Sequence, residues 1–179
     1  MNQVPIWFER KFEFTFPVEL HPNLCARLRG TPARLEELVR SAPRDVLVRK
    51  PRQREGEIEK EKWSAQEHVG HLLDLESLWL ARVDDYLKGG TELTAADLRN
   101  RKTEEANHNA RGVGEIMKKF RAERERLVKR TETIDPELFS RAMLHPRLKQ
   151  PMRLVDHLYF VAEHDDHHLA VAWELLHGG

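Results

Sequence analysis

Histidines near the end of the chain have the spacing of metal ligands. His164, His167 and His168 lie in the run AEHDDHHLAVAWELL. His164 and His168 are four residues apart, so on an α-helix their directions differ by only about 40° and they lie one turn apart. Two imidazoles placed in this way can bind one metal ion. A third nitrogen ligand is available in the earlier run WSAQEHVGHLLDLE, where His71 follows Trp63 by eight residues.

The helical face that holds these histidines is otherwise apolar. The positions within about 60° of His164 are His157, Phe160, Val161, His168, Val171 and Leu175. A single core histidine is usually hydrogen-bonded, but two at this spacing on one interior face favour a metal site. We therefore predict His164 and His168 as ligands. His157, two turns earlier on the same face, is either a further ligand or a hydrogen-bonded core residue.

The other histidines differ in the direction that they face. His71 is in line with Leu75 and Leu78, whereas His68 is displaced by about 60°, which makes His71 the better ligand. His167 points to the other side of its helix, so we expect it beside the site or at its rim. Four more lie in loops or at helix ends and are predicted to be solvated: His21, His108, His145 and His177.

A charged residue interrupts another apolar stripe. Arg124 lies between Phe120 and Leu127 in the middle of a predicted helix. Burying a guanidinium without a partner is very costly, so a carboxylate should meet it, with Glu76 as the first choice and Asp74 as the second. The alternative is that only the stem of Arg124 is buried and its head group reaches water.

Length and charge restrict the class of protein. A chain of 179 residues is expected to form one domain, spanning 1–179 with residues 1–21 as an N-terminal arm. Thirty Lys and Arg balance thirty Asp and Glu, so no overall basic field attracts nucleic acid or an anionic membrane. The basic run VRKPRQR (48–54) is followed at once by GEIEKEK, which favours a solvated loop over a phosphate site.

The single cysteine and the N-terminus indicate the compartment. Cys25 allows no intrachain disulfide, and its apolar neighbours indicate a small buried side chain instead of a nucleophile. The first residues contain charges where a signal peptide needs an apolar run, and no segment approaches the roughly 20 apolar residues of a membrane span. We expect a cytoplasmic protein with no membrane partner.

Helical periodicity predicts four long helices, at about 22–40, 64–87, 113–133 and 151–176. Gly30, Thr31 and Pro32 predict a break or a kink in the first. Ser64 and Glu67 form a capping box for the second, Gly89-Gly90 ends it, and Pro151 is predicted to open the fourth. Residues 11–17 are predicted to be an extended arm, and 91–112 an irregular connection with a helical turn near Thr94 and Asp97. The result is an all-α four-helix bundle, whose long connections allow an up-down-down-up order as well as a hairpin stack.

Together these motifs resemble a known family. They are Trp63-Ser64-x-x-Glu67-x-x-x-His71, the helix that ends FRAERERL, the HPRL loop at 145–148, and H-x-x-x-H at His164 and His168. In this order the set is similar to the DinB/YfiT-like metalloprotein superfamily, from about Pro22 to Leu176. The resemblance implies an up-down-down-up bundle, a divalent metal on His71, His164 and His168, and a homodimer. A glutamine that often follows the last ligand by three residues is Val171 here.

Three neutral imidazoles leave a metal ion its full charge and at least one open position, as in catalytic sites. All-nitrogen ligation suits zinc or nickel. Such an ion can lower the pKa of water or hold a thiol as its thiolate, and some relatives transfer low-molecular-weight thiols. We therefore expect a small-molecule substrate and a metal-dependent thiol S-transferase or a hydrolase-like enzyme. The competing hypothesis is a non-catalytic metal-binding stress-response module, because no residue is recognisable as a general base.

Overall fold

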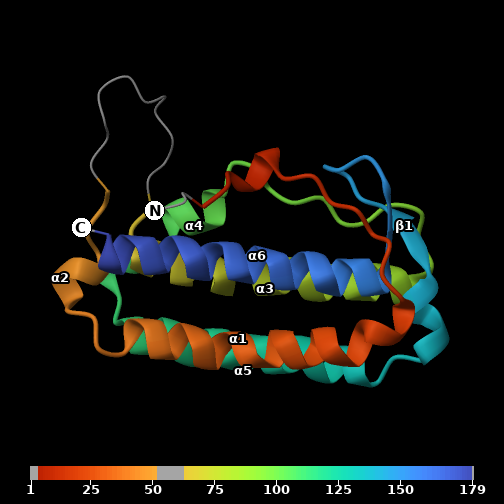
Figure 1. Cartoon of the computed structure of the whole chain (residues 1–179), viewed down its shortest axis with the longest axis horizontal. Helices are drawn as coiled ribbons and strands as arrows, with labels where there is room; N and C mark the ends of the chain where they lie inside the picture. The colour runs from red at the N-terminus through yellow and green to blue at the C-terminus, as the bar shows by residue number, and fades with distance from the viewer. Residues whose placement is uncertain (1–3, 52–62, 179) are drawn as a thin grey trace.

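The computed structural model describes residues 4–51 and 63–178. Its long helices are α1 (His21–Val39), α3 (Ala65–Lys88), α5 (Val113–Glu132) and α6 (Leu154–His177). The colours in Figure 1 show that α1 and α6 run in one direction and α3 and α5 in the other, which is the up-down-down-up order. Helices α1 and α3 each pack against both α5 and α6. Most of the mixed-charge segment predicted to be a solvated loop, residues 52–62, lies outside the described part.

Short elements precede the first long helix and connect the others. They are the 3-10 turns η1 (Trp7–Glu9), η2 (Val18–Leu20), η3 (His108–Ala110) and η4 (Pro136–Ser140), the helices α2 (Arg44–Leu47) and α4 (Arg101–Glu105), and the strands β1 (Ala142–Leu144) and β2 (Pro151–Arg153). None of the described helices combines the length and the apolar character needed to cross a membrane.

Helix α3 begins and ends where its sequence predicts. The Ser64 hydroxyl accepts from the Glu67 backbone N–H, and the Glu67 carboxylate accepts from the Ser64 N–H. At the other end Gly89 has a φ of 75°, the left-handed conformation that glycine adopts without steric cost. These caps fix the register of α3, and with it the position of His71.

Of the two alternatives predicted for the first helix, a break or a kink, the break is wrong, because α1 continues through Pro32. A proline inside a helix removes the N–H that would bond to the carbonyl four residues earlier. That carbonyl belongs to Leu28, and it accepts a hydrogen bond from Arg124 Nη1 at 3.3 Å. A side chain of α5 thus replaces the missing donor, which explains how α1 remains continuous.

The prediction that Pro151 opens the last helix is also wrong. Pro151 belongs to β2, which pairs antiparallel with β1, and α6 begins at Leu154. Met143 and Met152 are paired in this hairpin and both are buried, so its inner face extends the core. The Asp156 carboxylate accepts from the Arg153 backbone N–H at 2.8 Å and caps α6.

The N-terminal segment is extended and lies across the bundle (Figure 1). Phe12 is buried in the core, and the carbonyl of Phe12 accepts from Gln150 Nε2. In the 91–112 connection the short helix α4 begins at Arg101, later than the turn predicted near Thr94. The Asp97 side chain accepts from the backbone N–H of Arg101, at the start of α4. Cys25 is buried, as expected.

Candidate metal centre

Helices α3 and α6 bring three histidines together. Nitrogen atoms of His71, His164 and His168 all lie within 4.8 Å of one another. Nε2 of His164 and Nε2 of His168 are 3.1 Å apart. The three rings are buried, with exposed fractions of 4%, 4% and 6%. The geometry is that of side chains from two neighbouring helices that converge on one point.

The outward nitrogens of two of these rings have partners. Nδ1 of His71 is 3.0 Å from Thr103 Oγ1, and Nδ1 of His168 is 2.7 Å from Nδ1 of His68. When an outer nitrogen donates its proton, the inner Nε2 presents a lone pair to the cluster. For His164, Nδ1 has no hydrogen-bond partner among the described residues. The donor set therefore fits a divalent cation, which would be held by His71, His164 and His168.

Burial keeps these rings neutral. Burial, followed by the effect of nearby His68, lowers the pKa of His71 to about 3. Burial is also the main reason why the pKa values of His164 and His168 are well below the usual 6.5. The next cause is the neighbouring imidazole, which is His71 for His164 and His164 for His168. A neutral imidazole is the form that binds a metal, so the site has little competition from protons at neutral pH.

Tryptophan rings enclose the cluster. The edge of the Trp7 indole packs against His164 with ring centroids 5.0 Å apart, and Trp79 contacts the same ring at 5.5 Å. Trp63 contacts His71 at 4.6 Å. These contacts restrict the orientation of the imidazoles and surround them with apolar surface.

The histidines line a cavity of about 1190 Å³. Residues of α3 and α6 form one side of it. The rest of the described wall comes from residues 4–9, 95–100 and 145–147, together with Pro51 and Trp63. Much of the surface is apolar, including Leu75, Val171 and Leu175. A cavity of this size admits a small molecule to the histidines.

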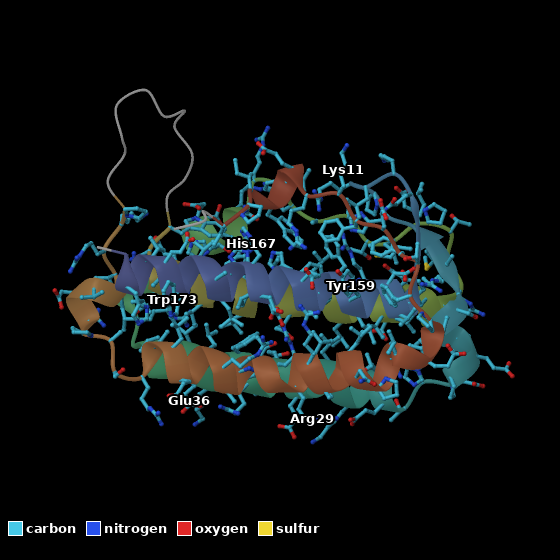
Figure 2. All side chains as sticks on the ribbon, in the orientation of Figure 1. Lys11, Arg29, Glu36, Tyr159, His167 and Trp173 are labelled. Carbon is cyan, nitrogen blue, oxygen red and sulfur yellow. The ribbon has the colours of Figure 1, made fainter. Side chains whose placement is uncertain are left out.

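The other predicted histidines surround the cluster without joining it. His68 lines the cavity and contacts His168. His167 also lines it, half-buried and close to Trp7; Figure 2 shows it on the side of α6 that faces the arm. Burial lowers the pKa of both His68 and His167 to about 4. His157 is fully buried and its Nε2 lies 3.4 Å from the carbonyl of Trp79. Of the two roles predicted for it, further ligand or hydrogen-bonded core residue, this position matches the second.

A buried ion-pair network lies beside the centre. Arg124 contacts Glu76, with Nη2 and Oε1 2.6 Å apart, so the partner expected from the sequence is present. Arg124 also pairs with Asp165, next to the ligand candidate His164, and Asp165 accepts from the Thr31 hydroxyl at 2.8 Å. Two carboxyl groups thus share one guanidinium, and burial raises the pKa of Glu76 to about 7 despite the opposing effect of Arg124.

The prediction that all four loop and terminal histidines are solvated is wrong for two of them. His108 is buried, with Nε2 2.8 Å from Asp74 Oδ2, which also explains why Asp74 is not the partner of Arg124. His145 is buried beside Arg82. No local signal marks these contacts, because each partner is more than thirty residues away in the sequence. Thr103 and Asp165 were not predicted for the same reason.

Comparison with known proteins agrees with this architecture. In solved structures the chain is similar to YfiT from Bacillus subtilis, described as a probable metal-dependent hydrolase with an unusual four-helix bundle topology. The TM-score is 0.75 at 21% identity, over 93% of this chain and 91% of that one. Comparison with curated proteins finds no match. The family model of the DinB superfamily matches residues 27–172, so this chain belongs to the DinB superfamily.

Proposed function

We propose that the protein is an enzyme that depends on a divalent metal ion, zinc or nickel, and transfers a small thiol to an electrophile. One observation supports this proposal most: three neutral imidazoles converge in the wall of a cavity large enough for a small molecule. A structural metal site is usually closed by four protein ligands, whereas a site with three protein ligands keeps a position for substrate.

The residues of the chain have separate parts in such a reaction. His71, His164 and His168 would hold the ion, which when bound would lower the pKa of a thiol that reaches it. The Thr103 hydroxyl and His68 orient two of the three rings. The apolar side chains of Leu75, Val171 and Leu175 would pack against apolar parts of the substrate.

A hydrolytic reaction is the second candidate. It is favoured by the similarity to YfiT, which is described as a probable metal-dependent hydrolase. The same three imidazoles and the same cavity would then serve a water nucleophile in place of a thiol. The two candidates differ in whether the product contains the thiol.

The test begins with elemental analysis of protein purified without an affinity tag, because the histidines of a tag bind nickel. The metal-loaded protein is then mixed with a chlorodinitrobenzene and, in turn, glutathione, coenzyme A, bacillithiol and mycothiol. We expect conjugation above the uncatalysed rate with at least one thiol. The matched control is His168→Ala, which loses one proposed ligand and should show the uncatalysed rate.

A wild-type rate equal to that of His168→Ala with every thiol would overturn the transferase proposal. Ester and amide substrates then test hydrolysis in the same pair of proteins. If neither reaction is detected, the metal-binding module becomes the better hypothesis. In that case the measurable effect of the metal is on stability, through binding to the folded state alone.

A further inference from the structure

Three nitrogen-bearing side chains meet at another part of the same cavity. Arg82 of α3 and His145 and Arg147 of the hairpin turn line it together with the metal-site histidines, and we refer to the three as the oxyanion cluster. Arg82 and His145 are each only 1% exposed. Among the described residues no carboxylate forms an ion pair with Arg82 or Arg147, whereas the equally buried Arg124 has two such partners.

The hydrogen bonds of His145 leave two donors facing each other. Its Nδ1 accepts from the backbone N–H groups of Arg147 at 3.2 Å and Leu148 at 3.1 Å. A neutral imidazole has one N–H, so the proton must be on Nε2. That Nε2 lies 3.1 Å from Nη1 of Arg82, which is also a donor. Burial and the two guanidinium groups lower the pKa of His145 to about 3, so the ring is neutral at pH 7.

Aromatic rings hold the two guanidinium groups in place. The Arg147 guanidinium lies over Phe8 and Phe160, 5.3 and 5.7 Å from the ring centroids. Its Nη2 is buried, and no described residue forms a hydrogen bond with it. The Arg82 guanidinium lies over Trp79 at 5.5 Å, and its Nε donates to the carbonyl of Thr94. Contacts over ring faces leave in-plane N–H groups available, and these bind oxyanions well.

We propose that the oxyanion cluster binds a carboxylate or phosphate group of the substrate. One oxyanion would supply the acceptor that Arg82, His145 and Arg147 share. The Trp79 indole lies between this cluster and the metal site, because it contacts both Arg82 and His164 at 5.5 Å. This inference rests on the proposed function for the reacting end of the substrate. The substrate is then a small anion whose charged group and reacting atom are separated by about the width of an indole ring.

The experiment uses the full chain after its metal has been removed and the chelator dialysed away. Inorganic phosphate and acetate are titrated separately at constant ionic strength, followed by calorimetry and by tryptophan fluorescence, to which Trp79 should respond. We expect saturable binding of at least one of the two, and the stronger one identifies the chemistry. Arg147→Gln should weaken it about tenfold, because it removes a charged hydrogen bond.

The matched control is Lys149→Gln, which removes one positive charge from the same hairpin where the side chain is 72% exposed. It should bind as the wild type does. If Arg147→Gln binds the anion as tightly as the wild type, Arg147 is not part of the site and the proposal is overturned. If Arg147→Gln and Lys149→Gln weaken binding equally, the anion is attracted by the general positive charge of the hairpin, which also overturns the proposal. Absence of saturable binding by the wild type would also overturn it.

The proposed function can fail separately. Metal-free His168→Ala keeps the oxyanion cluster, so it should bind phosphate or acetate as the wild type does. If the wild type binds the anion but has neither transferase nor hydrolase activity, the proposed function is wrong and the proposed anion site still stands. Arg147→Lys keeps the positive charge but loses the planar guanidinium with its two parallel N–H donors. We expect its affinity for the anion to lie between those of the wild type and Arg147→Gln.

Discussion

At the scale of single residues, the first prediction concerns the metal ligands. His164→Ala removes the nitrogen that lies 3.1 Å from Nε2 of His168, so the remaining two imidazoles come from different helices. We expect this variant to lose its metal under a chelator that leaves the wild type loaded. His177→Ala, at the end of α6 and exposed, should stay loaded. Stoichiometric metal in the chelated His164 variant, measured by elemental analysis, would show that the ion is held elsewhere.

A second residue, Thr103, should act on the metal through His71. Its hydroxyl contacts Nδ1 of that ring at 3.0 Å, and partners of this kind fix the orientation of a ligand. Thr103→Val keeps the shape and removes the hydroxyl, so metal affinity should fall by about tenfold or more. Competition with a fluorescent chelator measures it. Unchanged affinity would mean that the packing of α3 alone orients His71; Thr133→Val, at an exposed position, is the control.

At the scale of elements, the packing of α3 against η3 depends on one glycine. A Cβ on Gly70 would overlap the buried ring of His108. Gly30, in the middle of α1, has open space around its position. In a helix interior Gly→Ala usually stabilises by about 0.5–1 kcal/mol, which we expect for Gly30→Ala. Gly70→Ala should instead lower the free energy of unfolding, and urea denaturation of both variants tests the difference in sign.

The contact between α5 and its neighbours also depends on Arg124. Its guanidinium binds Glu76 of α3, Asp165 of α6 and the Leu28 carbonyl of α1. Arg124→Met leaves buried carboxyl groups unpaired and should cost about 3–5 kcal/mol. Arg130→Met removes an exposed pair with Asp84 between α5 and α3 and should cost less than about 1 kcal/mol. Equal costs would show that the network is no more important than a surface pair.

At the scale of the whole molecule, buried neutral histidines should make stability depend on pH. Histidines with a lowered folded-state pKa include His71, His145, His157, His164 and His168. Below an unfolded pKa of about 6.5 the unfolded chain binds protons that the folded chain does not, and each such proton lowers stability by about 1.4 kcal/mol per pH unit. Glu76 has a raised pKa, so it binds a proton more readily in the folded chain and makes the protein more stable as the pH falls. It is one group, and the histidines with the opposite effect outnumber it.

We therefore expect the metal-free protein to lose stability between pH 7 and pH 5. Urea denaturation at several pH values measures the slope. His157→Gln removes one titrating group that is not a proposed ligand and should reduce the slope, because its ring is fully buried and its pKa is well below the usual value. A flat profile in the wild type would contradict the prediction and indicate that water reaches these rings.

Local periodicity and capping chemistry were sufficient to predict the four long helices and their faces, apart from the continuity of α1 and the start of α6. His164 and His168 share a face because the helix repeat fixes their directions, whatever surrounds them. Ser64 and Glu67 cap α3 through atoms only three residues apart. The carboxylate partner of Arg124 was predictable because burying a guanidinium without a partner is very costly and a carboxylate is its strongest partner.

Contacts between distant segments were decided only by the tertiary structure. The Leu28 carbonyl meets Arg124 across 96 residues, which lets α1 pass through Pro32 where local rules predict a break. The β1–β2 hairpin places His145 and Arg147 in the wall of the cavity that holds the three histidines. Local rules describe only neighbours within about one helical turn, so the partners of Thr103, Asp165 and His145 could not be predicted from them. Only folding brings these side chains together, because most buried polar groups need a partner and the packed chain supplies it from distant segments.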